Sequence, residues 1–173
     1  MGFHFHHGHG LRRFAYDPEE VVEFLEIRPG QRIADLGAGD GFFSMAFKRK
    51  GAEVYAFDVD DYYFAQMQKE GIITIKQNLC EPISGRFDLA FMSNVYHDLA
   101  RSCRAAILEN LRRTADSVAV LDFKRDTPFG PPWKIDKDEV IRDMASAGFV
   151  LVKEKDLRFH YLLLFRKMPQ ERS

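Results

Sequence analysis

Short apolar runs alternate with helical patterns along most of the chain. Five of the runs are rich in β-forming residues, which predicts strands over Arg32–Leu36, Glu53–Asp58, Ile72–Gln77, Phe87–Ser93 and Ser117–Lys124. The segments 17–28, 41–50, 61–70 and 101–114 carry helix-start signals or apolar residues at helical spacing, which predicts a helix in each. Strands that alternate with helices in this way indicate a largely parallel sheet covered by helices on both faces.

The last third of the chain has a different pattern. A loop rich in proline and glycine, residues 127–133, precedes a predicted helix in which Asp136 and Glu139 resemble a capping box and Gly148 follows the last turn. Two further strands, Val150–Asp156 and His160–Lys167, are separated by only a few residues, so we expect them to pair antiparallel. The sequence therefore predicts an α/β, doubly wound, Rossmann-like sheet that ends in an antiparallel hairpin.

Composition indicates one soluble domain. The chain has 173 residues, of which 46% are hydrophobic and 29% charged, and its net charge of -1 provides no field that would attract nucleic acid or an anionic membrane. No apolar run approaches the roughly 18 residues that a membrane span needs. We expect one domain over residues 17–168, preceded by a histidine-rich segment (1–16) and followed by a short tail (169–173).

The two cysteines and the first residues bear on the compartment. Cys80 and Cys103 are too few for a disulfide framework, so we expect two reduced thiols in a cytoplasmic protein. The first residues, Met1 to His7, have neither the basic nor the apolar region of a signal peptide, which agrees with that expectation.

A glycine-rich turn follows the first predicted strand. Asp35 is followed by Gly37, Gly39 and Gly41, which gives G-x-G-x-G and not the G-x-G-x-x-G of dinucleotide folds. Glycines there let the backbone turn tightly and approach a ligand at the carboxyl edge of the sheet. A carboxylate beside the turn suits a ligand amino group better than pyrophosphate. Asp58 ends the second strand, where a carboxylate can accept hydrogen bonds from ribose hydroxyls.

In this order, the motifs resemble those of class I S-adenosylmethionine-dependent methyltransferases of the compact, type 11-like kind, over roughly residues 18 to 167. The resemblance implies a seven-stranded sheet and S-adenosylmethionine as cofactor. Residues 35–41 would hold its methionine end, Asp58 its ribose, and Val59 would pack on adenine. Asn78 stands where the family usually has an Asp that accepts from the adenine amine; its amide oxygen can accept the same bond, with Leu79 nearby.

The fourth strand completes the resemblance. Phe87–Ser93 matches the fourth-strand motif of the family, and residues 94–98 match the segment that lies beside the methyl group. The implied cofactor residues are therefore Asp35, Gly37, Ala38, Gly39, Gly41, Asp58, Val59, Asn78, Leu79, Ser93 and Asn94.

His97 is the candidate general base, because it follows the fourth strand and titrates near neutral pH. The alternative is a helix-start histidine whose ring is satisfied by the backbone. Tyr96 is the second candidate catalytic residue; it either orients a substrate oxygen or packs in the core. Methyl transfer from a sulfonium needs mainly alignment, so a base is required only where the acceptor must lose a proton.

The histidines at positions 4, 6, 7 and 9 raise the question of a metal site. A terminal segment without fixed geometry loses entropy on binding a metal, and no acidic residue or cysteine joins the cluster, so we predict no metal site. We interpret the segment as flexible or as a lid.

The function we predict is methyl transfer to a small-molecule acceptor, with no nucleic-acid or membrane partner. Two alternatives stay open: a non-catalytic module that binds S-adenosylmethionine, and a nicotinamide-dependent oxidoreductase, which the G-x-G-x-G spacing and Asp35 disfavour.

Overall fold

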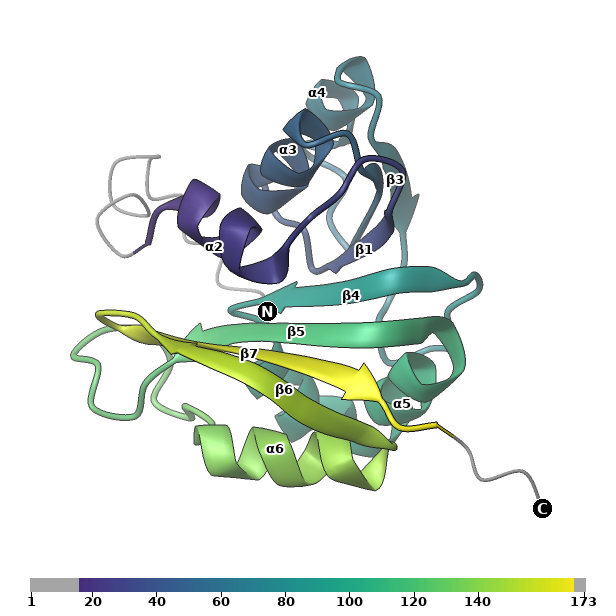
Figure 1. Ribbon diagram of the computed structural model, residues 1–173. Helices are drawn as coiled ribbons and strands as arrows, with labels where there is room; N and C mark the ends of the chain where they lie inside the picture. Colours follow the sequence, from purple (N-terminus) through teal and green to yellow (C-terminus); the bar gives the residue numbers. More distant parts are fainter. Residues whose placement is uncertain (1–15, 170–173) are drawn as a thin grey trace.

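The computed structural model describes residues 16–169 and contains one seven-stranded sheet. The strands run in the order β3-β2-β1-β4-β5-β7-β6 (Figure 1). Their bounds are β1 Arg32–Leu36, β2 Glu53–Asp58, β3 Ile73–Lys76, β4 Phe87–Ser93, β5 Ala115–Phe123, β6 Phe149–Asp156 and β7 His160–Lys167. Strands β1 to β5 pair in parallel, whereas β7 pairs antiparallel with both β5 and β6. The predicted doubly wound sheet with a terminal antiparallel hairpin is confirmed.

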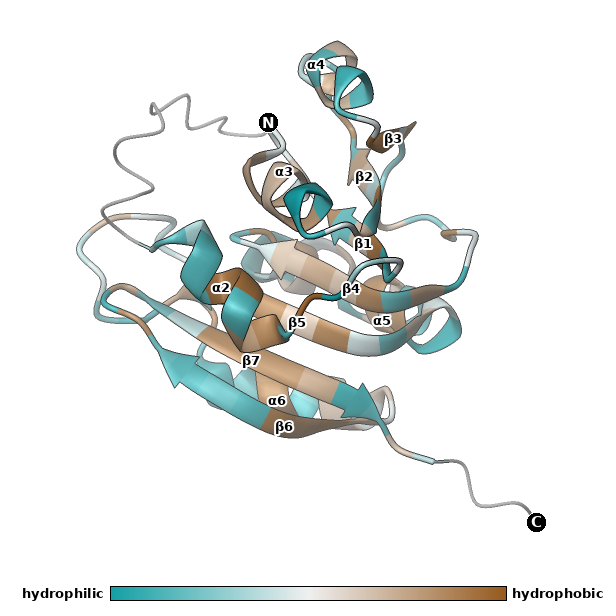
Figure 2. Cartoon of the chain, turned by 45° about the horizontal axis from the view of Figure 1, so that its top comes forward, coloured by the Kyte–Doolittle hydropathy of each residue, from teal (hydrophilic) through white to brown (hydrophobic). Residues whose placement is uncertain are grey.

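Within residues 16–169, five helices cover the two faces of the sheet. They are α2 Pro18–Leu25, α3 Phe42–Arg49, α4 Phe64–Lys69, α5 Tyr96–Thr114 and α6 Lys137–Ser146. The buried residues of α2, α3 and α4 share one hydrophobic cluster with one face of the strands, and those of α5 and α6 share a second cluster with the other face. Hydrophobic residues concentrate in the central strands, while hydrophobic and hydrophilic segments alternate along α2, α3 and α4 (Figure 2). The carboxyl ends of β1 to β5 therefore form one common edge between the two helical layers.

Helix starts show where sequence patterns are reliable. Asp17 caps α2 as predicted, since its side chain accepts from the backbone N–H of Glu19 at 3.0 Å. The capping box predicted at Asp136 is wrong: its side chain makes no cap hydrogen bond, and the Glu139 carboxylate instead lies 3.4 Å from Arg104 of α5. Glu139 thus forms an ion pair with Arg104 of another helix, where the capping box would have required a bond to the backbone of Asp136.

Helix α5 begins at Tyr96, earlier than the predicted start at Arg101. Its first turns bury Tyr96, Leu99 and Ala100, a pattern hidden by the polar residues between them. The helix is broken at Cys103, whose backbone (φ -155°, ψ 47°) is not helical. It therefore consists of two segments, and the prediction covered mainly the second.

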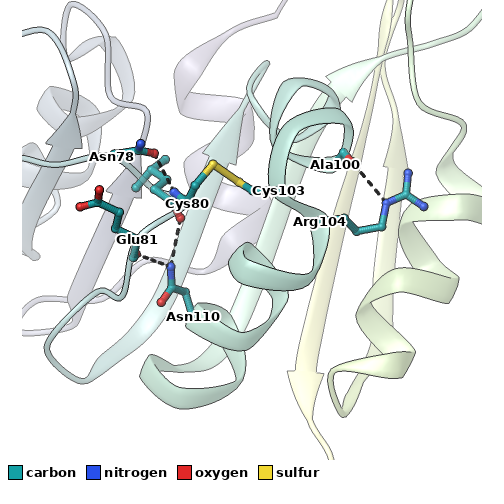
Figure 3. The surroundings of a disulfide bond; sticks show 8 residues. Asn78, Cys80, Glu81, Ala100, Cys103, Arg104 and Asn110 are labelled. Atoms are coloured by element: carbon teal, nitrogen blue, oxygen red, sulfur yellow. Dashed lines mark hydrogen bonds between the residues drawn. A yellow bond between two sulfur atoms is a disulfide. The ribbon is translucent and has the colours of Figure 1, made fainter.

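The expectation of two reduced thiols is also wrong. Cys80 and Cys103 form a disulfide with a Cα–Cα distance of 5.6 Å (Figure 3). The loop between β3 and β4 packs against α5, which brings together two cysteines that are 23 residues apart in sequence. Sequence spacing carries no sign of this pairing, because the approach depends on how α5 crosses the sheet.

In the stretch from Tyr16 to Pro169, no helix combines the length and the apolar character that crossing a bilayer requires.

Candidate functional site

The glycine turn between β1 and α3 is built on the end of β2. The backbone N–H groups of Gly37 and Ala38 both donate to the Phe57 carbonyl, at 2.8 and 3.0 Å. The Gly39 N–H donates to the Asp58 carboxylate at 2.8 Å. All three glycines of the turn, at positions 37, 39 and 41, have positive φ. The structure therefore brings the glycine turn and the predicted ribose-binding acid into direct contact.

The three glycines serve different purposes. A Cβ at Gly37 would lie 3.0 Å from Val95, and one at Gly41 would lie 2.7 Å from Met67, so both positions need glycine for internal packing. A Cβ at Gly39 would meet no atom of the protein within 4 Å. Gly39 therefore exposes bare backbone to open space, which is where a ligand can approach the turn closely.

A cavity of about 490 Å³ lies at the ends of β2 and β3, lined by Val59, Lys76, Gln77, Asn78 and Glu81. Val59 is 60% exposed at its rim, an unusual exposure for a valine that follows a buried strand. Asp58 directly precedes Val59 in the chain and is the register partner of Lys76, so two residues of the cavity lining adjoin it. Both residues predicted to contact adenine, Val59 and Asn78, line this cavity.

The loop after β3 holds Asn78 in place. The Asn78 side-chain oxygen accepts from the Cys80 N–H at 2.9 Å. Leu79 is buried in the core below α5, and its carbonyl accepts from the Asn110 side chain at 3.0 Å (Figure 3). Leu79 thus packs in the core beneath the cavity.

Asp35 lies beneath the turn. Its carboxylate is only 2% exposed and accepts from the Ser44 hydroxyl of α3 at 2.6 Å. Burial raises the pKa of Asp35 to about 7, against the lowering effect of the Ser44 bond, and the charges of Asp58 and Asp40 add to the rise. The Asp35 carboxylate therefore connects β1 to α3 through Ser44. Its direct contact with a ligand amino group stays a prediction.

Ser93 and Asn94 lie at the end of β4. Ser93 is the register partner of Leu121, and the Asn94 N–H donates to the Leu121 carbonyl at 2.8 Å. Asn94 has a positive φ of 55°, a conformation that asparagine tolerates better than most residues. Its side-chain NH₂ donates to the Tyr16 hydroxyl at 3.2 Å, which connects the chain before α2 to the sheet edge.

His97 is buried between two acids. Its Nδ1 lies 2.8 Å from Asp122, and its Nε2 lies 3.4 Å from Asp98. Asp98 also accepts from the indole N–H of Trp133 at 2.7 Å, so the network reaches the loop of residues 127–135. Burial by itself lowers the pKa of His97, but the hydrogen bond to Asp122 and the charges of both acids outweigh it and raise the pKa. With Asp122 of β5 beside Nδ1 and Asp98 beside Nε2, the ring of His97 connects the start of α5 to β5.

Tyr96 lies apart from these groups. Its ring is fully buried in the cluster beneath α5 and α6, and its hydroxyl donates to Asp143 of α6 at 2.7 Å. Burial and the Asp143 bond raise the pKa of this phenol. Of the two interpretations of Tyr96, the structure supports packing in the core.

His160 was missed by sequence reasoning. It begins β7, pairs with Phe123 and is only 1% exposed. Its ring lies 4.6 Å from the Phe123 ring and 4.9 Å from the Tyr16 ring, measured between centroids. Burial, together with the charge of Lys124, lowers the pKa of His160 to about 4, so the ring is neutral at pH 7. A lone histidine at a strand start gives no sequence signal for this.

Three buried side-chain polar atoms within residues 16–169 have no hydrogen-bond partner: Asn94 Oδ1, His160 Nδ1 and His160 Nε2. Both residues contact Tyr16, Asn94 through a hydrogen bond and His160 through its ring. Buried unsatisfied polar groups destabilise a fold and concentrate where function needs them. These atoms make the part of the sheet edge beyond β4 a candidate for the second half of the site.

In the described range 16–169, no group of three or more histidine, cysteine or acidic side chains is placed to hold a metal ion. The histidines at positions 4, 6, 7 and 9 lie outside the described residues, as does the interpretation of that segment as a lid.

Comparison with known proteins agrees with this geometry. Residues 34–118 match the type 11 family model described as a methyltransferase domain. An S-adenosylmethionine-dependent methyltransferase from Aquifex aeolicus superposes with a TM-score of 0.80 at 22% identity, over 91% of this chain and 93% of that one. A putative type 11 methyltransferase from Sulfolobus solfataricus gives a TM-score of 0.76 at 21% identity, over 92% and 96%. No curated protein sequence matches the chain.

A further solved structure contains bound ligands. The 1,6-didemethyltoxoflavin-N1-methyltransferase of Burkholderia thailandensis, with bound 1,6-didemethyltoxoflavin and S-adenosylhomocysteine, superposes with a TM-score of 0.70 at 19% identity, over 88% of this chain and 76% of that one. The chain has the fold of these solved S-adenosylmethionine-dependent methyltransferases, and residues 34–118 match the type 11 methyltransferase model. The resemblance inferred from the motifs is confirmed.

Proposed function

We propose that the protein transfers a methyl group from S-adenosylmethionine to a small-molecule acceptor. The observation that carries the proposal is the contact between Gly39 and Asp58 beside a cavity of about 490 Å³. The bare backbone of Gly39 and the carboxylate of Asp58 face the space in which a nucleoside with a zwitterionic side chain would lie. The family match and the fold support the same assignment.

The residues present fit this cofactor. In the proposed arrangement, Asp58 accepts from the ribose hydroxyls, Val59 and Asn78 contact adenine, and residues 37–41 run along the methionine end. When bound, S-adenosylmethionine supplies an activated methyl group on a sulfonium. The protein then has to bind the acceptor, exclude water and align the acceptor atom with the methyl carbon.

We place the acceptor at the second half of the site, near Asn94 and His160. Asn94 Oδ1 is free to accept one hydrogen bond, and a neutral His160 ring offers one donor and one acceptor. The aromatic rings of Tyr16 and Phe123 on either side of His160 suit a planar, uncharged acceptor. The arrangement favours alignment over proton removal by His97, since both its ring nitrogens lie beside acids.

The first test measures cofactor binding by calorimetry. We expect S-adenosylhomocysteine to bind the parent chain, and Asp58→Ala to lower the affinity at least tenfold, because each charge-assisted bond contributes about 1.5–3 kcal/mol. Asp116→Ala removes an exposed carboxylate at the start of β5 and should leave the affinity unchanged. Absence of binding at millimolar ligand by a folded parent would refute the proposal.

The second test separates an enzyme from a module that only binds S-adenosylmethionine. The protein is incubated with methyl-labelled cofactor and a fractionated metabolite extract, and labelled products are identified by mass spectrometry. We expect a labelled small molecule that depends on the protein and on Asp58. Tight cofactor binding with no labelled product in any fraction would instead favour the binding module.

Partners and location belong to the same proposal. A net charge of -1 supports a protein that acts without nucleic acid. A cytoplasmic location is part of the proposal as well, although the Cys80–Cys103 disulfide removes the reduced-thiol argument for it, and cell fractionation tests it directly.

A further inference from the structure

The loop after β3, residues 78–83, is attached to α5 at two separate points. The first is the Asn110 side chain, which donates to the carbonyls of Leu79 and Glu81 at 3.0 and 2.8 Å and accepts from the Ile83 N–H at 3.0 Å. The second is the disulfide between Cys80 and Cys103 (Figure 3). The loop would therefore stay docked through Asn110 if the disulfide were broken.

The disulfide lies at the cavity end of this loop. The Cys80 N–H donates to the Asn78 side chain at 2.9 Å. Asn78 and Glu81, two residues before and one residue after Cys80, both line the cavity of about 490 Å³. The position of Cys80 thus determines the position of side chains that face the proposed adenine site.

The other end of the disulfide lies at the break in α5. Cys103 is the residue whose φ of -155° and ψ of 47° interrupt the helix. The segment before the break carries His97 and Asp98, and the segment after it carries Asn110. The bond therefore joins the cavity loop to the point where the two parts of α5 meet.

Both cysteines are half-buried, so neither is enclosed in the core. A thiolate from solution or from another protein can therefore approach the disulfide, as thiol–disulfide exchange requires. A structural disulfide of the core would be shielded from such attack.

We propose that Cys80–Cys103 is a thiol–disulfide exchange site that sets cofactor affinity, with a dithiol reductant as its reaction partner. This inference rests on the proposed function, because the ligand it controls is S-adenosylmethionine or its product. In the reduction, two electrons and two protons pass from the dithiol to the S–S bond. The protein gains two thiols, and the reductant becomes a disulfide.

The expected direction follows from the two attachments. The oxidised form holds Asn78 beside an open cavity, so the binding arrangement is already formed. Reduction leaves the Asn110 bonds in place but frees residues 78–80 and the break at Cys103. Binding must then order them again, which lowers affinity in proportion to the population that remains competent. We expect reduction to weaken S-adenosylhomocysteine binding about 5- to 20-fold while the protein stays folded.

The experiment compares the oxidised and the dithiothreitol-reduced forms of the full chain, with thiol labelling and mass spectrometry to establish each state. Affinity for S-adenosylhomocysteine is measured by calorimetry, and hydrogen exchange is followed over residues 78–83 and 100–104. Reduction should accelerate exchange in both segments and lower affinity. Cys80→Ser and Cys103→Ser should each bind like the reduced parent, with or without dithiothreitol, and melting curves should show that both are folded.

Ser102→Ala is the matched control, since it changes an exposed neighbour of Cys103 and should keep the full response to reductant. Affinities within twofold between the oxidised and reduced parent would overturn the switch while leaving the proposed function intact. So would two free thiols in the air-oxidised protein. If neither state binds S-adenosylhomocysteine, the proposed function fails, and the switch fails with it.

Discussion

The two halves of the sheet edge are built in different ways. At the ends of β1 to β3, the glycine turn and Asp58 meet through groups only 19 residues apart in sequence. Beyond β4, Asn94 meets Tyr16 across 78 residues, and His97 meets Asp122 across 25. The glycine turn of the first half is held by backbone N–H groups that bond to the end of β2, whereas the second half depends on side-chain contacts, the longest of which spans 78 residues. The half at the ends of β1 to β3 suits a cofactor that many proteins of this fold share. The half beyond β4 suits an acceptor that is particular to one protein.

Of the substitutions that test this comparison, we expect one at Asp122 to change the stability of the fold most. Its carboxylate is fully buried and accepts from the ring and the backbone N–H of His97 and from the Phe123 N–H. Asp122→Ala leaves the buried ring nitrogen of His97 and two backbone N–H groups without their partner, so we expect a loss of about 3–5 kcal/mol in the free energy of unfolding. Urea denaturation measures it. Asp122→Asn, which keeps one acceptor oxygen, should lose less. A loss below about 1 kcal/mol for Asp122→Ala would show that the network carries little of the fold's stability.

The next largest effect is the pH dependence of stability that His160 causes, on the same half of the sheet edge. The folded-state pKa of His160 is depressed to about 4, so between about pH 6.5 and 4 the unfolded state binds more protons than the folded state. Stability is therefore lost as the pH falls through this window, by about 2–3 kcal/mol from this residue.

His160→Phe removes that contribution, and it also removes two unsatisfied buried nitrogens. We expect the variant to be at least as stable as the parent at about pH 7, and to lose less stability on acidification to about pH 4.5. Denaturation at a series of pH values measures both. If His160 serves the acceptor, methyl transfer falls although stability does not. A variant less stable at neutral pH, with unchanged acid sensitivity, would show that His160 is only a packing residue.

The buried carboxyl group of Asp35 gives stability a pH dependence opposite to that of His160. Its folded-state pKa is raised to about 7, so the folded state binds more protons than the unfolded state between about pH 4 and 7. Its contribution to stability therefore falls as the pH rises through this window. The opposing slopes of Asp35 and His160 partly cancel in the parent, which is why the His160 variant reveals more than the parent's profile alone.

The smallest expected effect on stability comes from Gly39→Ala, in the half of the edge at the ends of β1 to β3. Gly39 and Gly148 both have positive φ and open space where a Cβ would lie, so Gly39→Ala and Gly148→Ala should each cost roughly 1 kcal/mol of stability. Only Gly39→Ala places a methyl group against the proposed cofactor, so it should lower S-adenosylhomocysteine affinity at least tenfold. Calorimetry on the pair tests this; equal affinities would place the ligand elsewhere.

The contrast between local patterns and tertiary contacts also explains which features could be predicted from the sequence. The bounds of β1, β2, β4 and β7 agree with the prediction residue for residue, because turns and glycines punctuate these strands. The start of α5 and the failed capping box at Asp136 were missed, since tertiary burial and the Arg104–Glu139 ion pair decide them. The disulfide and the burial of His160 depend on the packing of α5 and β7 against distant residues. No local pattern encodes such contacts.

The strand order also constrains how the chain can fold as it is made. β7 follows both β5 and β6 in sequence, yet it lies between them in the interior of the sheet. Until the ribosome has released residues 160–167, β5 and β6 lack their shared partner, and β5 presents an apolar, unpaired edge. The final sheet therefore forms only after this strand emerges, and a chaperone that shields β5 during synthesis would raise the yield of folded protein.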